Sequence, residues 1–196
     1  RAAMQAYLWA WRLFEADKHT PPESWRKAME RSLDFLVAHQ NPSDGSLPNF
    51  GANDGALPSI LSTCDFSDFR PTLQALSTVT RRERLYPSGP WDEEALWFIG
   101  PEAASMKVRA LSHRSVSFTD SGYHVQRGRQ SGSFSSFRCG KLGDRFSQID
   151  MLHLDVHWKG INVFSDGGSY LYNGPREWHD HFFRTASHNT IEIHGR

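Results

Sequence analysis

The sequence predicts an α+β protein in which a helical part precedes an antiparallel β-part. In residues 2–40, apolar side chains recur every three or four positions, as on one face of an α-helix. From about Lys107 the apolar period changes to two, as in half-buried strands. Because helices come first and strands second, we expect two layers or domains with a boundary near residues 100–106. We therefore divide the 196 residues into a helical domain, 1–103, and a β-domain, 104–196.

Two consecutive helices open the chain. The first is predicted over residues 2–18, where the apolar positions share one face: Met4, Leu8, Trp11 and Phe14. Thr20 and Glu23 have the spacing of a capping box, with Pro21 at the first helical position, so a second helix should run from there to Gln40. The short connection makes the two helices antiparallel.

A loop and two further helices complete the helical part. Residues 41–59 hold three glycines and three prolines, more turn-forming residues than a helix connection needs. Long loops of this kind are often functional. A helix is predicted over residues 71–82 and a shorter one over 92–99, acidic at its start and ended by Gly100.

Segments of alternating polarity predict the strands, and clusters of Asp and Gly predict turns between them. The turns are Asp120-Ser121-Gly122 and Asp166-Gly167-Gly168. The alternating segments are Val116–Phe118, Tyr123–Val125, Phe134 to Phe137 and Leu152–Trp158.

The composition limits the partners. Lys plus Arg and Asp plus Glu number 22 each, so no global field attracts nucleic acid or an anionic membrane. Residues 107–145 contain eight basic and two acidic residues, an excess of six positive charges. This local excess fits solvated strand faces, and it also fits a surface that attracts a polyanionic sugar. Cys64 and Cys139 are too few for a disulfide framework or a cysteine zinc site. No apolar run reaches the roughly 18 residues of a membrane span.

The order of several motifs resembles the heparinase II/III-like polysaccharide lyases. The motifs are LPNFGANDGALPSILSTCDFSDFRP, RLYPSGPWDEEALWFIG, FTDSGYHVQRG and the final third, DRFSQIDMLHLDVHWKG to HNT. The resemblance implies the end of an incomplete (α/α) toroid followed by an antiparallel β-sandwich, with substrate in the groove between them. It also implies that the chain is a fragment whose preceding toroid lies before Arg1, and that the protein is periplasmic or extracellular.

The resemblance implies β-elimination on a polysaccharide that contains uronic acids. A base removes the proton next to the C5 carboxylate, donors stabilise the resulting anion, and an acid protonates the leaving O4. The family signature for base and metal is His-x-His-x-Asp, then an Asp in a glycine turn, then His-Asn-Thr.

Carried over by position, this signature assigns a zinc site to the final third of the chain. Asp166 and His188 match two ligands, Asp150 matches the first-motif aspartate, and Gln148 stands at the first ligand position. Phe146 stands where the family has its base. The alternative for Asp166 and His188 is a turn cap and a histidine hydrogen-bonded within the sandwich.

Because phenylalanine cannot transfer a proton, the base should come from elsewhere, or the reaction has been lost. The candidates for proton transfer are Tyr170, Tyr172 and His188. The candidates for substrate binding are Arg1, Asn53, Asp54, Trp178, His179 and Arg184. Each candidate also has a structural explanation. Asn53 and Asp54 could simply form a turn. Arg184 could pair with an acidic residue of the chain, and Trp178 and His179 could lie in a solvated loop.

His153, Asp155 and His157 share one face of a predicted strand, with Leu154 and Trp158 on the other face. Adjacent members of the polar set could share a metal, but the two histidines lie about 13 Å apart along a straight strand. We expect this set to form a polar stripe that faces a groove or solvent.

Together, these observations predict a polysaccharide lyase acting on an acidic polysaccharide or oligosaccharide, with zinc as its cofactor. The alternative is a non-catalytic glycan-binding or polysaccharide-assembly protein on the same scaffold, which the residues at 146 and 148 favour. A glycoside hydrolase would need two carboxylates facing a groove, and the sequence offers no convincing pair.

Overall fold

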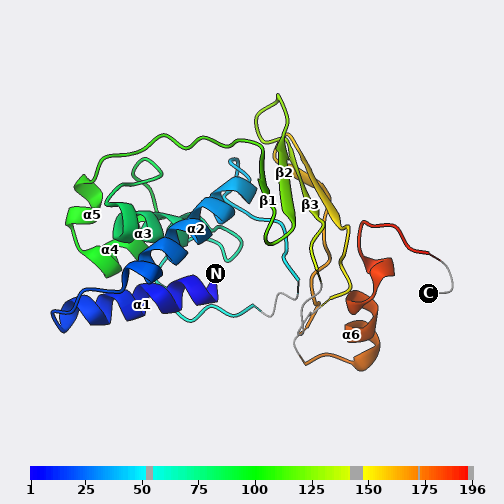
Figure 1. The fold of residues 1–196 in the computed structure, drawn as a ribbon, viewed down its shortest axis with the longest axis horizontal. Coiled ribbons are helices and arrows are strands. Elements are labelled where there is room, and N and C mark those ends of the chain that lie inside the picture. The colour runs from blue at the N-terminus through cyan, green and yellow to red at the C-terminus, as the bar shows by residue number, and fades with distance from the viewer. Residues whose placement is uncertain (52–54, 142–147, 172, 194–196) are drawn as a thin grey trace. The chain divides into compact units, whose positions relative to one another are not determined.

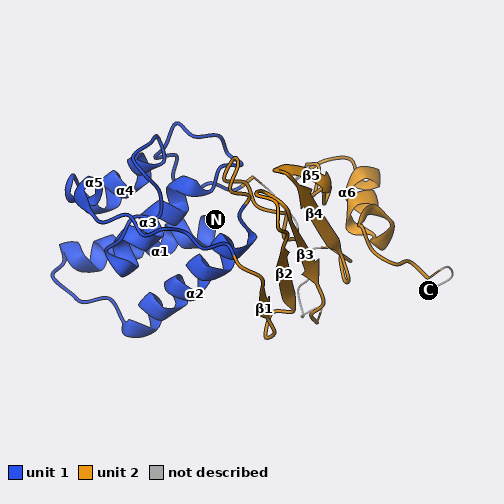
Figure 2. Ribbon diagram, turned by 90° about the horizontal axis from the view of Figure 1, so that it is seen from above, with its two compact units in different colours: residues 1–40, 56–113 blue, residues 41–55, 114–196 orange. Residues whose placement is uncertain are grey.

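The computed structural model describes residues 1–51, 55–141, 148–171 and 173–193. The chain forms two compact units, coloured separately in Figure 2. Residues 1–40 and 56–113 make up the first, and residues 41–55 and 114–196 make up the second. Each unit is described by itself.

The first unit is a group of helices around α3 (Arg70–Arg81), with α1 (Ala2–Ala16), α2 (Glu23–His39), α4 (Asp92–Ile99) and α5 (Glu102–Ser105). Helix α3 packs against α1, α2 and α4, and every residue from Pro71 to Thr80 is buried (Figure 1). Its leucines meet Leu8, Met29, Leu33 and Phe98 in the core. Each fully buried leucine contributes about 2 kcal/mol to folding.

Polar residues on α3 join the helices to the connections between them. The side-chain oxygen of Gln74 accepts the N–H of Leu85 at 2.7 Å, and its amide donates to Asp92 at 2.7 Å. Asp92 also pairs with Arg84 at 2.7 Å. These groups satisfy one another's hydrogen bonds except at Arg84 Nε, which is buried without a partner among the described residues.

The predicted helices are present, but the capping box is not. Helix α2 begins at Glu23 after Pro22, without a side-chain cap, because two consecutive prolines hold the preceding backbone extended. The Glu23 carboxylate accepts hydrogen bonds from Arg26 instead of reaching back to Thr20.

The second unit contains one five-stranded antiparallel sheet within the described residues, in the order β1-β2-β3-β4-β5 (Figure 1). Helix α6 (Arg176–Phe183) and a 3₁₀ turn at Thr185–Ser187 follow the sheet. Sequence reasoning predicted neither α6 nor β5. The strands are β1 (Val116–Phe118), β2 (Tyr123–Arg127), β3 (Phe134–Arg138), β4 (Leu154–Trp158) and β5 (Ile161–Phe164).

The two faces of β4 are opposite to the expectation from hydrophobicity. Asp155 and His157 are buried, whereas Leu154 and Trp158 are 38% and 53% exposed. Polar neighbours lie close together on this buried face: His157 Nδ1 lies 3.0 Å from Asp155 Oδ1, and Asn162 Nδ2 donates to Asp155 Oδ2 at 3.3 Å. The imidazole also stacks on Phe134, with ring centroids 4.3 Å apart. The polar stripe was expected to face a groove or solvent; it does not face solvent, and two of its members, His153 and Asp155, line a cavity.

The glycine-rich and proline-rich loop belongs to the sheet unit. Asn41 donates to the carbonyl of Gly160 at 2.9 Å, and Asn49 donates to the carbonyl of Asp166 at 3.0 Å. A side chain at position 160 would meet Ser43 Oγ at 2.4 Å, so glycine is required for this close approach. The loop is thus fixed against both ends of β5.

The α+β class is confirmed by helices in the first unit and an antiparallel sheet in the second. The toroid remains a prediction. No helix in the described ranges is both long and apolar enough to cross a bilayer.

Gly122 provides a test of the sheet packing. Its φ is +71°, and a Cβ would lie 2.2 Å from Gly140 Cα. We expect Gly122→Ala to destabilise the protein by about 3 kcal/mol, from backbone strain and forced displacement together.

Gly55 is the matched control, because its φ is +73° but no atom of the described residues lies within 4 Å of its Cβ position. Gly55→Ala should cost only the strain, about 1 kcal/mol. Urea unfolding of both variants measures the difference, and equal losses would contradict the packing described at Gly122.

Candidate metal and acid–base site

Asp166 lies in a tight turn that follows β5. Its Oδ1 accepts the backbone N–H of Gly168 at 2.7 Å, so the carboxylate is fixed by its own turn. Gly168 has a φ of +67°, which glycine adopts without strain. Asn49 holds the main-chain oxygen of Asp166. The carboxylate is therefore buried in one defined orientation.

The His188-Asn189-Thr190 motif lies beside this turn because its last two side chains attach it to other segments. Asn189 Nδ2 donates to the carbonyl of the residue before Asp166, at 3.1 Å. Thr190 Oγ1 donates to the carbonyl of Met151 at 2.7 Å. These bonds position His188 Nδ1 at 3.0 Å from Asp166 Oδ2.

His153 joins the same group from the segment just before β4. The N–H of Leu154 donates to the carbonyl of Asn189 at 3.0 Å, and the N–H of Asn189 donates to His153 Nδ1 at 3.2 Å. His153 Nδ1 also lies 3.8 Å from Asp166 Oδ2. His153, Asp166 and His188 thus offer three ligand atoms within 4.8 Å of one another.

The three side chains have little access to solvent and carry the right chemistry for a metal. His153, Asp166 and His188 are 6%, 5% and 8% exposed. The Nε2 atoms of both histidines are buried without a hydrogen-bond partner among the described residues. Burial lowers the pKa of His153, although Asp166 opposes the effect, so neutral imidazole is favoured. Two imidazoles and a carboxylate fit zinc.

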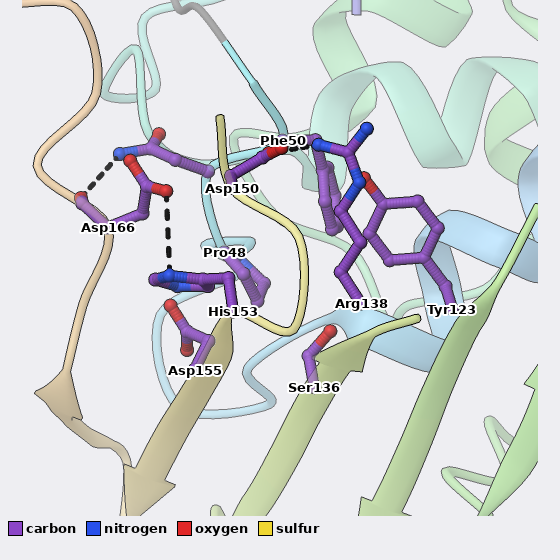
Figure 3. Close-up of a pocket in the computed structure, with 10 residues that line it drawn as sticks. Pro48, Phe50, Tyr123, Ser136, Arg138, Asp150, His153, Asp155 and Asp166 are labelled. Atoms are coloured by element: carbon purple, nitrogen blue, oxygen red, sulfur yellow. Dashed lines mark hydrogen bonds and ion pairs between the residues drawn. The ribbon is translucent and has the colours of Figure 1, made fainter. Parts of the chain in front are cut away.

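A small cavity of about 10 Å³ adjoins this group (Figure 3). His153, Asp155 and Asp166 line one side of it, and Tyr123 and Arg138 line the other. The lining is polar and comes from the loop 41–55, from β2 and β3, and from the segment around β4. The cavity therefore combines the candidate metal ligands with a guanidinium and a phenol.

Arg138, which is half-buried, forms an ion pair with the buried Asp150 at the cavity wall. The Arg138 guanidinium also lies 5.7 Å from the ring centroid of Tyr123. Burial raises the pKa of the Tyr123 phenol, while Arg138 opposes this shift. At neutral pH the phenol is therefore a proton donor, and the guanidinium next to it would stabilise the phenolate left by proton transfer.

Gln148 is buried beside the Asp166 turn. Its side-chain amide donates to the carbonyl of Gly168 at 2.8 Å, while Oε1 is buried without a partner among the described residues. The contact fixes the same turn that orients Asp166. Whether Gln148 binds a metal stays a prediction.

The other predicted site residues are distributed over both units. Tyr170 and Trp178 are 60% and 45% exposed, with ring centroids 5.6 Å apart. His179 and Arg184 are exposed, on α6 and just after it. Arg1 lies in the helical unit, where it donates to Thr72 at 3.1 Å. Four further predicted residues lie outside the described part of the chain: Asn53, Asp54, Phe146 and Tyr172.

Sequence reasoning assigned no site role to Tyr123 or Arg138 and gave His153 only a polar-stripe role. Tyr123 and Arg138 are directly opposite each other in the β2–β3 register. The available signal was that Tyr123 follows the predicted turn at Gly122, but the strand pairing cannot be read from hydrophobic alternation. His153 required knowledge that residues 188–190 lie against the start of β4.

Comparison with known proteins agrees with this architecture. Residues 110–196 match the family model described as heparinase II/III-like, C-terminal. A search of curated proteins found no match. That segment is therefore similar to the C-terminal part of heparinase II/III-like proteins.

Solved structures extend the likeness of the fold to nearly the whole chain. A heparinase III aligns over 98% of this chain with a TM-score of 0.70 and 19% identity, covering 28% of its own length. The heparan sulfate lyase HepC from Pedobacter heparinus aligns over 95%, with a TM-score of 0.63, 19% identity and 27% of its length. The chain thus spans less than a third of these proteins and shares the fold of that part.

The ion pair at the cavity wall can be tested by a double-mutant cycle. Arg138→Met leaves Asp150 buried and uncompensated, so we expect a loss of about 3 kcal/mol in unfolding free energy. The double variant Arg138→Met/Asp150→Leu should lose less unfolding free energy than Arg138→Met alone, because it no longer contains the uncompensated carboxylate.

An exposed ion pair serves as the control. Arg109 lies 3.5 Å from Glu83 with its side chain 60% exposed, so Arg109→Met should change stability by no more than about 0.5 kcal/mol. Strictly additive losses at positions 138 and 150 in chemical denaturation would contradict a coupled buried pair.

Proposed function

We propose that the protein containing this chain is a polysaccharide lyase that cleaves uronic-acid-containing polysaccharides by β-elimination. Support comes from the heparinase II/III-like C-terminal domain and from the fold shared with heparinase III and a heparan sulfate lyase. The observation that carries the proposal is the polar cavity in which Arg138 and Tyr123 face His153 and Asp166.

The reaction needs a base that takes the C5 proton, a positive charge that stabilises the resulting anion and an acid that protonates the leaving oxygen. The cavity residues can supply the last two, and we place the base outside this cavity. The proton at C5 is weakly acidic, so positive charge must stabilise the anion that forms when it leaves. Arg138 provides such a charge, and it is already oriented by Asp150. The glycosidic oxygen that leaves must receive a proton, and Tyr123 holds one in the same cavity.

The proposal includes a zinc ion bound by Asp166 and His188. Both side chains are buried, and their polar atoms lie 3.0 Å apart. Zinc supplies Lewis acidity toward an oxygen that it binds, such as that of a sugar carboxylate. The protein's part is to hold the two ligands in a fixed geometry through the Gly168 turn and the Asn189 and Thr190 clamps.

Two described phenols are candidates for proton transfer, and we assign the role to Tyr123. Tyr123 lines the cavity beside Arg138, whereas Tyr170 is exposed and stacks on Phe182. Tyr170 and Trp178 are better suited to stacking against a sugar ring outside the cavity. His179 and Arg184, also exposed, are candidates for contacts with further sugar units.

The second candidate function is a glycan-binding or polysaccharide-assembly protein without catalytic activity. The observation that favours it is Gln148, which stands at a motif histidine position and uses its amide to hold Gly168. Sugar binding with no cleavage, with or without zinc, would support this function and overturn the lyase proposal.

The lyase proposal predicts a new unsaturated-uronate absorbance when the full-length protein is incubated with heparan, alginate or related uronates. Tyr123→Phe should lower kcat by about 100-fold or more, because a positioned acid contributes 10²–10⁴-fold. Tyr170→Phe should change kcat by less than about 5-fold, since stacking needs only the ring.

A neutral polysaccharide controls for contaminating activity, because it has no C5 carboxylate. Equal losses in the two variants, or a larger loss at Tyr170, would contradict the role given to Tyr123. Circular dichroism of each variant separates loss of fold from loss of chemistry.

A further inference from the structure

We propose that His153 is the third protein ligand of a zinc-class metal site, together with Asp166 and His188, in place of the residue at position 148. The inference deepens the proposed function, because it uses the same site, but it concerns only where the metal is bound. It names a histidine that lies outside the family signature and explains how the site can be complete although Gln148 stands at a ligand position.

Two of the three separations between the candidate ligand atoms are close to those of tetrahedral coordination, and all three are within 4.8 Å. Bonds of about 2.0 Å to one ion put neighbouring ligand atoms about 3.3 Å apart. Asp166 Oδ2 lies 3.0 Å from His188 Nδ1 and 3.8 Å from His153 Nδ1. One observed separation is shorter than this ideal value and the other is longer. Side-chain rotations that move the ligand atoms by a few tenths of an ångström would bring both separations to it.

A backbone contact sets the tautomer of His153. The N–H of Asn189 donates to His153 Nδ1, so Nδ1 is the unprotonated nitrogen and the ring proton belongs on Nε2. Nδ1 also lies 3.8 Å from Asp166 Oδ2. A metal bound at Nδ1 would take the place of the Asn189 hydrogen bond, since Nδ1 has a single lone pair.

Gln148 acts as a positioning residue in this arrangement. Its amide donates to the carbonyl of Gly168, whose own N–H donates to Asp166 Oδ1. An amide is a poor zinc ligand compared with imidazole, but it is well suited to hold a turn. Loss of the Gln148 side chain should loosen Asp166 rather than remove a ligand.

The charges around the cavity also favour a divalent cation. Three carboxylates line it, but Asp150 pairs with Arg138 and Asp155 lies 3.0 Å from His157. Among the described residues, the titratable groups that contact the buried Asp166 are the imidazoles of His153 and His188. A divalent ion bound there would compensate the buried carboxylate.

His157 does not belong to this site, although it is the next buried histidine along the same strand face. It lies against Asp155 and stacks on Phe134. It is 3% exposed, compared with 6% for His153. His157 is therefore the matched control: the same residue type with similar burial, outside the three-residue group.

The test measures zinc affinity of the full-length protein without any turnover assay. Protein stripped with a chelator is titrated with zinc in competition with a chromophoric chelator. We expect one zinc per chain, and His153→Ala should weaken binding by about 100-fold or more, beyond the 10–100-fold typical of outer-shell changes. His157→Ala should change affinity by less than about 5-fold, and Gln148→Ala by about 10-fold.

A second variant identifies the ligand directly and does not depend on a loss. His153→Cys loaded with cobalt should show a thiolate-to-cobalt absorption band that His157→Cys lacks. Unchanged affinity in His153→Ala, or no such band in His153→Cys, would overturn the inference. If the protein binds zinc through His153 but cleaves no uronate, the inference is supported and the lyase proposal is contradicted.

Discussion

A buried carboxylate has to be hydrogen-bonded or neutralised, and the β-unit is organised around one. Asp166 is held by the N–H of Gly168 and contacts His188. The turn that carries it also fixes α6, because the Phe182 ring lies where a side chain at Gly167 would be, 2.9 Å from its Cβ position. The loop 41–55 reaches the same turn through Asn49. Contacts with Asp166 and its turn therefore bring together segments that are distant in the sequence.

The fold was largely predictable because most of it follows from local patterns. Apolar spacing located helices α1 to α4, and alternation located β1 to β4, since both periods are written into the sequence. Helix α6 was missed because its eight residues, with Trp178 and two histidines, have no buried position to create a clear apolar face. The orientation of β4 was missed because pairing among Asp155, His157 and Asn162 made the polar face the buried one.

The candidate site was predictable only where a motif names it. Asp166 and His188 follow from a glycine turn and a His-Asn-Thr sequence, and the structure brings them together. His153, by contrast, was judged by its spacing from His157 along one strand. Its proximity to Asp166 arises from the bond between Leu154 and Asn189, a tertiary pairing between segments more than thirty residues apart. Strand periodicity carries no information about such a contact.

Anomalous X-ray scattering at the zinc edge, from crystals of the full-length protein grown with zinc, would locate a metal bound by His153, Asp166 and His188. We expect one peak within about 2.0 to 2.2 Å of a ligand atom from each of the three residues. A peak bonded to Gln148 but not to His153, or no peak beside Asp166, would contradict it.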